Sequence, residues 1–118
     1  MQPTREQAFE KLDEIENIQP DQIQDGSIPP RVETIDIVRK IIEDKKIDVP
    51  FLSVAADGEI VLRWGKRNPV AYASIRPNSI ALLAICGELR YKFSAQNLDS
   101  LCLINIKEFS KIGLNDFE

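Results

Sequence analysis

The chain of 118 residues lacks histidine altogether and contains only two cysteines. Histidine is the commonest general base and metal ligand, so its absence excludes nucleophile–histidine catalysis. Cys86 and Cys102 lie in separate apolar runs, and neither has a second cysteine at the spacing of a zinc or redox motif. We expect both to be buried as small hydrophobic residues, and we expect no metal and no cofactor.

Long hydrophobic runs are also missing. No apolar run approaches the ~20 residues of a membrane span. Arg5, Glu6 and Glu10 prevent an apolar signal-peptide core near the N-terminus. We therefore expect a cytoplasmic protein without membrane association, and the length favours one domain.

Two common ligand loops are absent from the sequence. Only Gly65 precedes Lys66 closely, whereas a phosphate-binding P-loop needs the full GxxxxGK[ST] spacing. The residues after Asp57 do not complete a calcium loop. We expect that the protein is not an enzyme; an uncharacterised enzyme that works without histidine is the alternative.

Charge is distributed unevenly along the chain, whose net charge is −4. Residues 1–59 hold 7 basic and 14 acidic side chains, whereas residues 60–118 hold 8 basic and 5 acidic ones. This pattern predicts an acidic helical half beside a basic sheet half.

Helices are expected at both ends of the chain. Thr4 and Gln7 have capping-box spacing and begin a helix over residues 5–17. A loop over 18–30 leads to a second helix that ends before Pro50. That helix should have Pro30 in its first turn, an apolar stripe at Val32, Ile35, Val38, Ile41 and Ile42, and Lys45 and Lys46 in its last turn.

The period changes from 3.6 to 2 after Pro50, which indicates strands. We expect them at 51–55, 59–64, 70–76, 79–86 and 89–93, with a two-residue turn at Asp57-Gly58. The 79–86 strand is apolar on both sides and should be central. Residues 98–112 fit a helix, although 101–106 could form a strand.

These elements predict an α+β fold: N-terminal helices packed on a roughly five-stranded antiparallel meander, with a C-terminal helix. The whole chain, 1–118, should form one domain with its core in 31–118. The alternative is that residues 1–30 form a loosely attached helical arm.

Residues 50–64 resemble a pattern found in small uncharacterised bacterial proteins. In that pattern a helix and a proline precede a strand, a D-G-E-I turn and a strand that ends in tryptophan, here Trp64. The resemblance implies an α+β fold, with Asp57 and Gly58 in a turn and Trp64 anchoring the core. It implies no activity.

We expect a small non-catalytic protein that occupies a surface of a macromolecular partner, most simply another protein. Acidic bacterial or phage proteins of this size are often immunity proteins, antitoxins or inhibitors of defence nucleases, including anti-CRISPR-like proteins; this step is an analogy. The candidate contact residues are acidic and lie on the first two helices: Glu6, Glu10, Asp13, Glu14, Glu16, Glu33, Asp36, Glu43 and Asp44.

A nucleic-acid-binding module is the alternative, with a basic sheet face formed by Arg63, Arg76, Arg90 and Lys92. Alternation argues against it, because Trp64, Tyr91 and Phe93 should face away from these cations and enter the core. A homodimer formed by edge-strand pairing is a further alternative.

Overall fold

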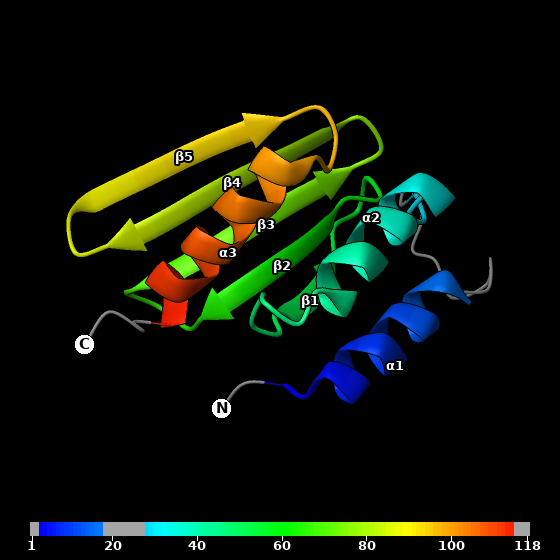
Figure 1. Ribbon diagram of the computed structural model, residues 1–118. Helices are drawn as coiled ribbons and strands as arrows, with labels where there is room; N and C mark the ends of the chain where they lie inside the picture. The colour runs from blue at the N-terminus through cyan, green and yellow to red at the C-terminus, as the bar shows by residue number, and fades with distance from the viewer. Residues whose placement is uncertain (1–2, 18–27, 115–118) are drawn as a thin grey trace.

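The structure is a computed structural model that describes residues 3–17 and 28–114. Two helices come first, α1 (Arg5–Glu16) and α2 (Val32–Glu43), and α3 (Ser100–Leu114) comes last. Between them lie five strands: β1 (Phe51–Val54), β2 (Ile60–Gly65), β3 (Val70–Arg76), β4 (Ser79–Cys86) and β5 (Leu89–Ala95). The strands pair antiparallel in chain order, so the expected α+β meander is confirmed (Figure 1).

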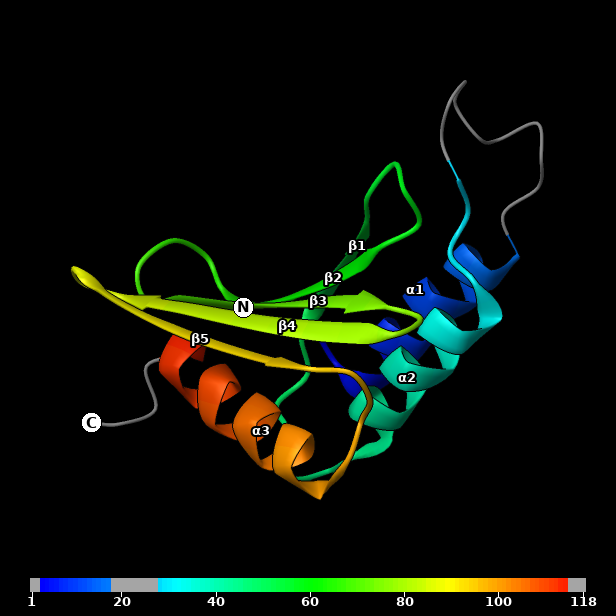
Figure 2. The ribbon, with the colours of Figure 1, turned by 90° about the horizontal axis from the view of Figure 1, so that it is seen from above.

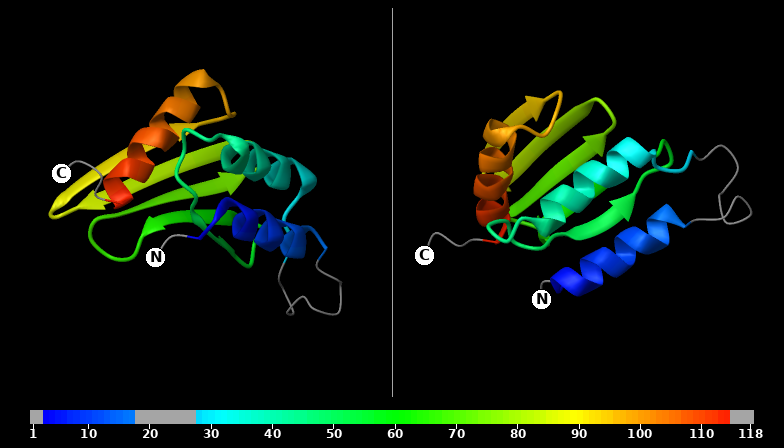
Figure 3. Two further views of the ribbon diagram at one scale, coloured as in Figure 1. Left: turned by 60° about the horizontal axis from the view of Figure 1, so that its bottom comes forward. Right: turned by 45° about the vertical axis from the view of Figure 1, so that its right-hand side comes forward.

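The helices lie on one side of the sheet. Figure 2 shows the sheet nearly edge-on, with α3 on one face; none of the three helices of the described segments lies over the opposite face of β2 to β5. The right panel of Figure 3 shows α3 and α2 in front of the strands, and α1 packs against α2 and β1. We call the side under α2 and α3 the covered face and the opposite side the open face.

The first helix packs against the rest of the fold. Its capping box is present, because the Gln7 N–H donates to Thr4 Oγ1 at 3.1 Å and the Thr4 N–H donates to Gln7 Oε1 at 2.8 Å. Leu12 is fully buried in the core cluster. The Arg5 guanidinium donates to the carbonyl of Ile42 at the end of α2, where a cation complements the helix dipole. This contact joins the N-terminal end of α1 to the C-terminal end of α2.

Three expectations for the second helix are wrong. Pro30 lies before the helix rather than in its first turn, since α2 begins at Val32 with Arg31 as its N-cap. Val32 is 61% exposed, because helical periodicity places it on the solvent side of α2 with Asp36 and Lys40. Lys45 and Lys46 follow the helix, which ends at Glu43.

The β1–β2 hairpin is confirmed, but its turn differs from the expected type. The Ala55 N–H donates to the Glu59 carbonyl at 2.8 Å, so three residues, 56–58, separate the paired positions. Gly58 takes the left-handed conformation (φ 87°) that three-residue hairpin loops place at their last position.

Trp64 anchors the covered face. Its side chain is 1% exposed, and its indole N–H donates to the carbonyl of Asp48 at 2.7 Å. The end of α3 approaches the sheet closely here, because Gly113 lies on the backbone of Trp64 and Ala71. A Cβ at Gly113 would lie 2.4 Å from the Trp64 carbonyl oxygen, so the absence of a side chain permits this contact.

The C-terminal segment is helical, as favoured, and the strand alternative for residues 101–106 is excluded. The expected burial of both cysteines is wrong in one case: Cys102 is buried on the inner side of α3, whereas Cys86 is exposed at the end of β4. In the part of the chain that the structure describes, no helix has the length and apolar character needed to cross a membrane.

Candidate binding face of the sheet

All four basic side chains of the strands lie on the open face. Register and alternation place Arg63, Arg76, Arg90 and Lys92 on the face opposite the one that packs against the core. The five strands contain no Asp or Glu. The sheet therefore presents positive charge on the side that no helix within residues 3–17 and 28–114 covers.

Side chains of three kinds form a continuous row across the open face. Paired positions join the ring of Phe51, the guanidinium of Arg63, the ring of Tyr72, Leu83 and the ammonium of Lys92, one residue from each strand. We call these five residues the large row. The Arg63 guanidinium carbon lies 4.9 Å from the Phe51 ring centroid, a cation–π contact. Arg63 Nε is buried and has no hydrogen-bond partner within the described segments.

A second row, two positions along each strand, consists of short side chains. Ser53, Val61, Ser74, Ala81 and Ser94 are paired across the five strands, and we call them the small row. The height difference between the two rows leaves a groove of about 590 Å³ that runs from β2 to β5. Tyr72, Leu83 and Lys92 line this groove together with four members of the small row: Val61, Ser74, Ala81 and Ser94.

Arg76 differs from the other cations of the open face. Its Nη2 lies 2.9 Å from Asp57 Oδ2 and 2.5 Å from Glu59 Oε2, both in the β1–β2 turn segment. These carboxylates raise the pKa of Arg76. The pKa of Asp57 is lowered, first by the hydrogen bond from the Glu59 N–H and then by Arg76. Arg76 therefore fixes the hairpin, and its charge is largely neutralised by local partners.

The expectation for the aromatic residues is only partly correct. Trp64 enters the core and Phe93 packs against it, but Tyr91 is 43% exposed because α3 crosses β2, β3 and β4 more than β5. Phe51 and Tyr72, in contrast, share the open face with Arg63 and Lys92. The period of 2 that turns Trp64 inward places these two rings beside the cations.

β4 is an inner strand by pairing, as its apolar pattern predicted, and it lies between β3 and β5. Leu83 and Ile85 lie on the open face and are half-buried. Their apolar character does not mark a face that a helix of the described segments covers. In the structure they line an uncovered surface instead.

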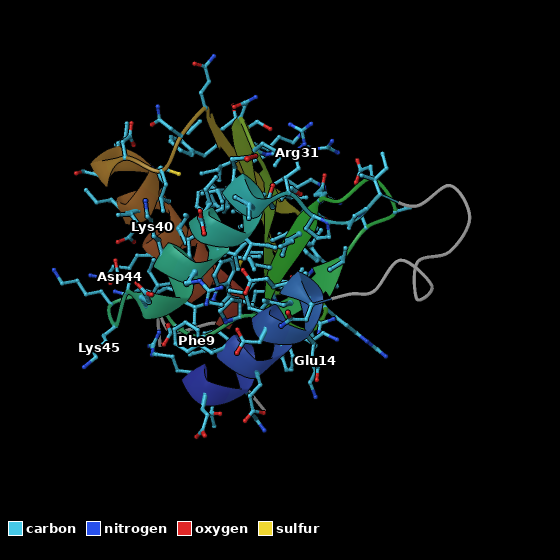
Figure 4. All side chains as sticks on the ribbon, turned by 90° about the vertical axis from the view of Figure 1, so that its right-hand side faces the viewer. Phe9, Glu14, Arg31, Lys40, Asp44 and Lys45 are labelled. Atoms are coloured by element: carbon cyan, nitrogen blue, oxygen red, sulfur yellow. The ribbon has the colours of Figure 1, made fainter. Side chains whose placement is uncertain are left out.

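The acidic candidates lie on α1, α2 and the turn after α2. Figure 4 views these helices from the side, with Glu14 at α1 and Lys40, Asp44 and Lys45 at α2 and the turn that follows it. Arg39 of α2 contacts Asp13 at 3.9 Å and Glu16 at 3.3 Å, and Lys11 contacts Glu14 at 3.8 Å. The other five helical carboxylates are exposed and make no ion pair with a described residue: Glu6, Glu10, Glu33, Asp36 and Glu43.

Few arrangements in the described chain suit catalysis. Residues 3–17 and 28–114 contain no group of three or more His, Cys, Asp or Glu side chains that could hold a metal ion. Burial, aided by Asp99, raises the pKa of Cys102 to about 11, so its thiol is protonated and unreactive near neutral pH. Cys86 is exposed at the end of β4, and Ile85 and Gly87 flank it in the chain.

Comparisons with known proteins identify no relative. No protein-family model matches the chain, and neither a curated protein nor a solved structure is significantly similar to it. The function must therefore be argued from the surface itself.

Proposed function

We propose that the protein is a small, non-catalytic binding protein whose open sheet face receives an anionic macromolecule. One observation carries the proposal: the strands contribute four cations and no acidic side chain, and all four cations lie on the same face. Arg76 is paired with Asp57 and Glu59, but Arg63, Arg90 and Lys92 form no ion pair with a described residue. A surface of one sign attracts partners of the opposite sign and accelerates their encounter. Lys66 and Arg67, both exposed in the β2–β3 turn, extend the same charge.

Retention on immobilised heparin tests this proposal, because a chain of net charge −4 should bind a polyanion only through a segregated basic surface. We expect the wild type to be retained at about 50 mM NaCl. The double variant R90E/K92E should elute well before physiological salt. The control K40E/K45E has the same change of charge at exposed positions of the helical side and should elute like the wild type. Equal loss of retention in both variants, or no retention of the wild type, would contradict the proposal.

The helical layer supports a second candidate function. Its five exposed, unpaired carboxylates, described above, suit a protein that docks on a basic cleft, as an immunity protein or a nuclease inhibitor does. Reversal of Glu6 and Glu10 should then abolish partner capture from host cells, whereas reversal of Asp13, already paired with Arg39, should weaken it less. Capture that depends on Arg90 and Lys92 instead would exclude this candidate.

A further inference from the structure

We infer that the macromolecule on the open face is a single-stranded nucleic acid that follows the groove across the strands and stacks its bases on the large row. This inference rests on the proposed function and names the partner of the same surface. It depends on three features of the face: its planar groups, its cations and the composition of its groove.

The planar groups are placed where bases could stack. Tyr72 is half-exposed at the wall of the groove, and the guanidinium of Arg63 lies over Phe51 on the strands beside it. Single strands bind proteins by stacking on aromatic rings and on Arg guanidinium planes. From β2 to β5 the groove spans three strand spacings, ~14 Å. Sheet-based RNA modules hold about two or three bases on a comparable surface.

The cations are placed where the phosphates would pass. Arg90 and Lys92 are exposed on β5 at one end of the large row, and Arg63 lies toward the other end. Arg76 is excluded from this set because Asp57 and Glu59 already hold it. Three cations should give a slope of log affinity against log salt of about −2 for a single strand.

The small row favours a nucleic acid over an acidic protein. The centre of a protein–protein interface is depleted in Ser and Ala, yet Ser74, Ala81 and Ser94 form the groove. Hydroxyl groups suit sugar, phosphate and base edges, all of which accept hydrogen bonds. Short side chains also let a backbone approach the sheet closely. A duplex would not fit this arrangement, because its base faces are stacked on one another and cannot reach Tyr72.

Fluorescence anisotropy with labelled oligothymidine and oligouridine of about 12 nucleotides, and with a duplex of that length, tests the inference on the full chain. We expect single strands to bind more tightly than the duplex, with the salt slope given above. Y72A should weaken binding about tenfold, the loss of one stacked base. A81F should weaken it as well, because exposed Ala81 can accept a ring that fills the groove without changing the charge.

Tyr91 provides the matched control. It is exposed at 43% but belongs to the other face of β5, so Y91A should bind like the wild type. Equal sensitivity to Y72A and Y91A, equal affinity for the duplex, or no effect of A81F would overturn the inference. If no oligonucleotide binds at low salt while heparin retention still depends on Arg90 and Lys92, the inference fails, the proposed function stands, and an acidic protein becomes the partner to seek.

Discussion

The covered and open faces of the sheet alternate residue by residue along the same strands, yet their chemistry differs. The covered face is apolar and is closed by α2, α3 and the buried ring of Trp64. The open face mixes cations, rings, hydroxyls and half-buried aliphatic side chains, and no helix of the described chain lies on it over β2 to β5. An antiparallel sheet needs only one packed face for stability. The rings and aliphatic groups of the open face are therefore not explained by folding.

Neighbouring leucines on β4 provide the strongest test of this comparison. Leu82 is 2% exposed on the covered face, whereas Leu83 is half-buried on the open face. L82A should lower the free energy of unfolding by about 2–5 kcal/mol, because it leaves a cavity in the core. L83A should cost about 1 kcal/mol or less, since water can occupy the space. Urea denaturation measures both, and similar costs would show that the open face is packed in solution.

The contact between α3 and the sheet provides the next largest effect. G113A should cost about 1–3 kcal/mol, because its methyl group would meet backbone atoms of Trp64 and Ala71. Gly87 is the matched glycine: nothing lies within 4 Å of a Cβ there, and only its positive φ of 64° opposes a side chain. G87A should thus cost about 1 kcal/mol. A smaller cost for G113A than for G87A, again from urea denaturation, would contradict the close approach.

A substitution at Thr34 of α2 should raise the free energy of unfolding rather than lower it. Thr34 is fully buried, and its hydroxyl has no hydrogen-bond partner within the described segments. T34V keeps the shape and removes the unsatisfied group, so it should raise the free energy of unfolding by about 1 kcal/mol. The control T34S keeps the hydroxyl, loses a methyl group and should destabilise. Destabilisation by T34V in thermal unfolding would mean that the hydroxyl has a partner in solution.

Substitution of Asp57, at the edge of the open face, should have the smallest effect on the free energy of unfolding. This effect should depend on pH. The pKa of Asp57 is lowered in the folded state, so its contribution to stability is present above the unfolded value of about 3.9 and is lost as the pH falls through the folded value. D57N should therefore differ from the wild type at neutral pH and converge with it in acid. Urea denaturation at several pH values measures this difference, and a difference that persists at low pH would point to packing rather than charge.

The sequence predicted local features well because their causes are local. Thr4 and Gln7 begin α1 through their own side chains, and the bounds of β3 and β4 follow from alternation between turns. Whether other elements cover each face of the sheet was harder to predict. The two-sided apolar pattern of β4 does not reveal whether a second layer exists, because that depends on where distant helices pack.

The candidate site also combines features with local causes and features that depend on distant parts of the chain. Alternation placed the four cations on one face, but the two rows depend on the register of all five strands. The pairing of Arg76 with Asp57 and Glu59 depends on the turn that brings them together. Sequence spacing alone therefore could not separate Arg76 from Arg63, Arg90 and Lys92, nor place Phe51 beside Arg63.

The most direct test of the central claim is to map by NMR which backbone amides change when a short heparin fragment is added to the labelled protein. The account predicts that the changed signals cluster on β2 to β5, including Ser74, Ala81, Lys92 and Ser94, and that α1 and α2 stay unaffected. Changes confined to the helices, or spread evenly over both sides of the sheet, would contradict it.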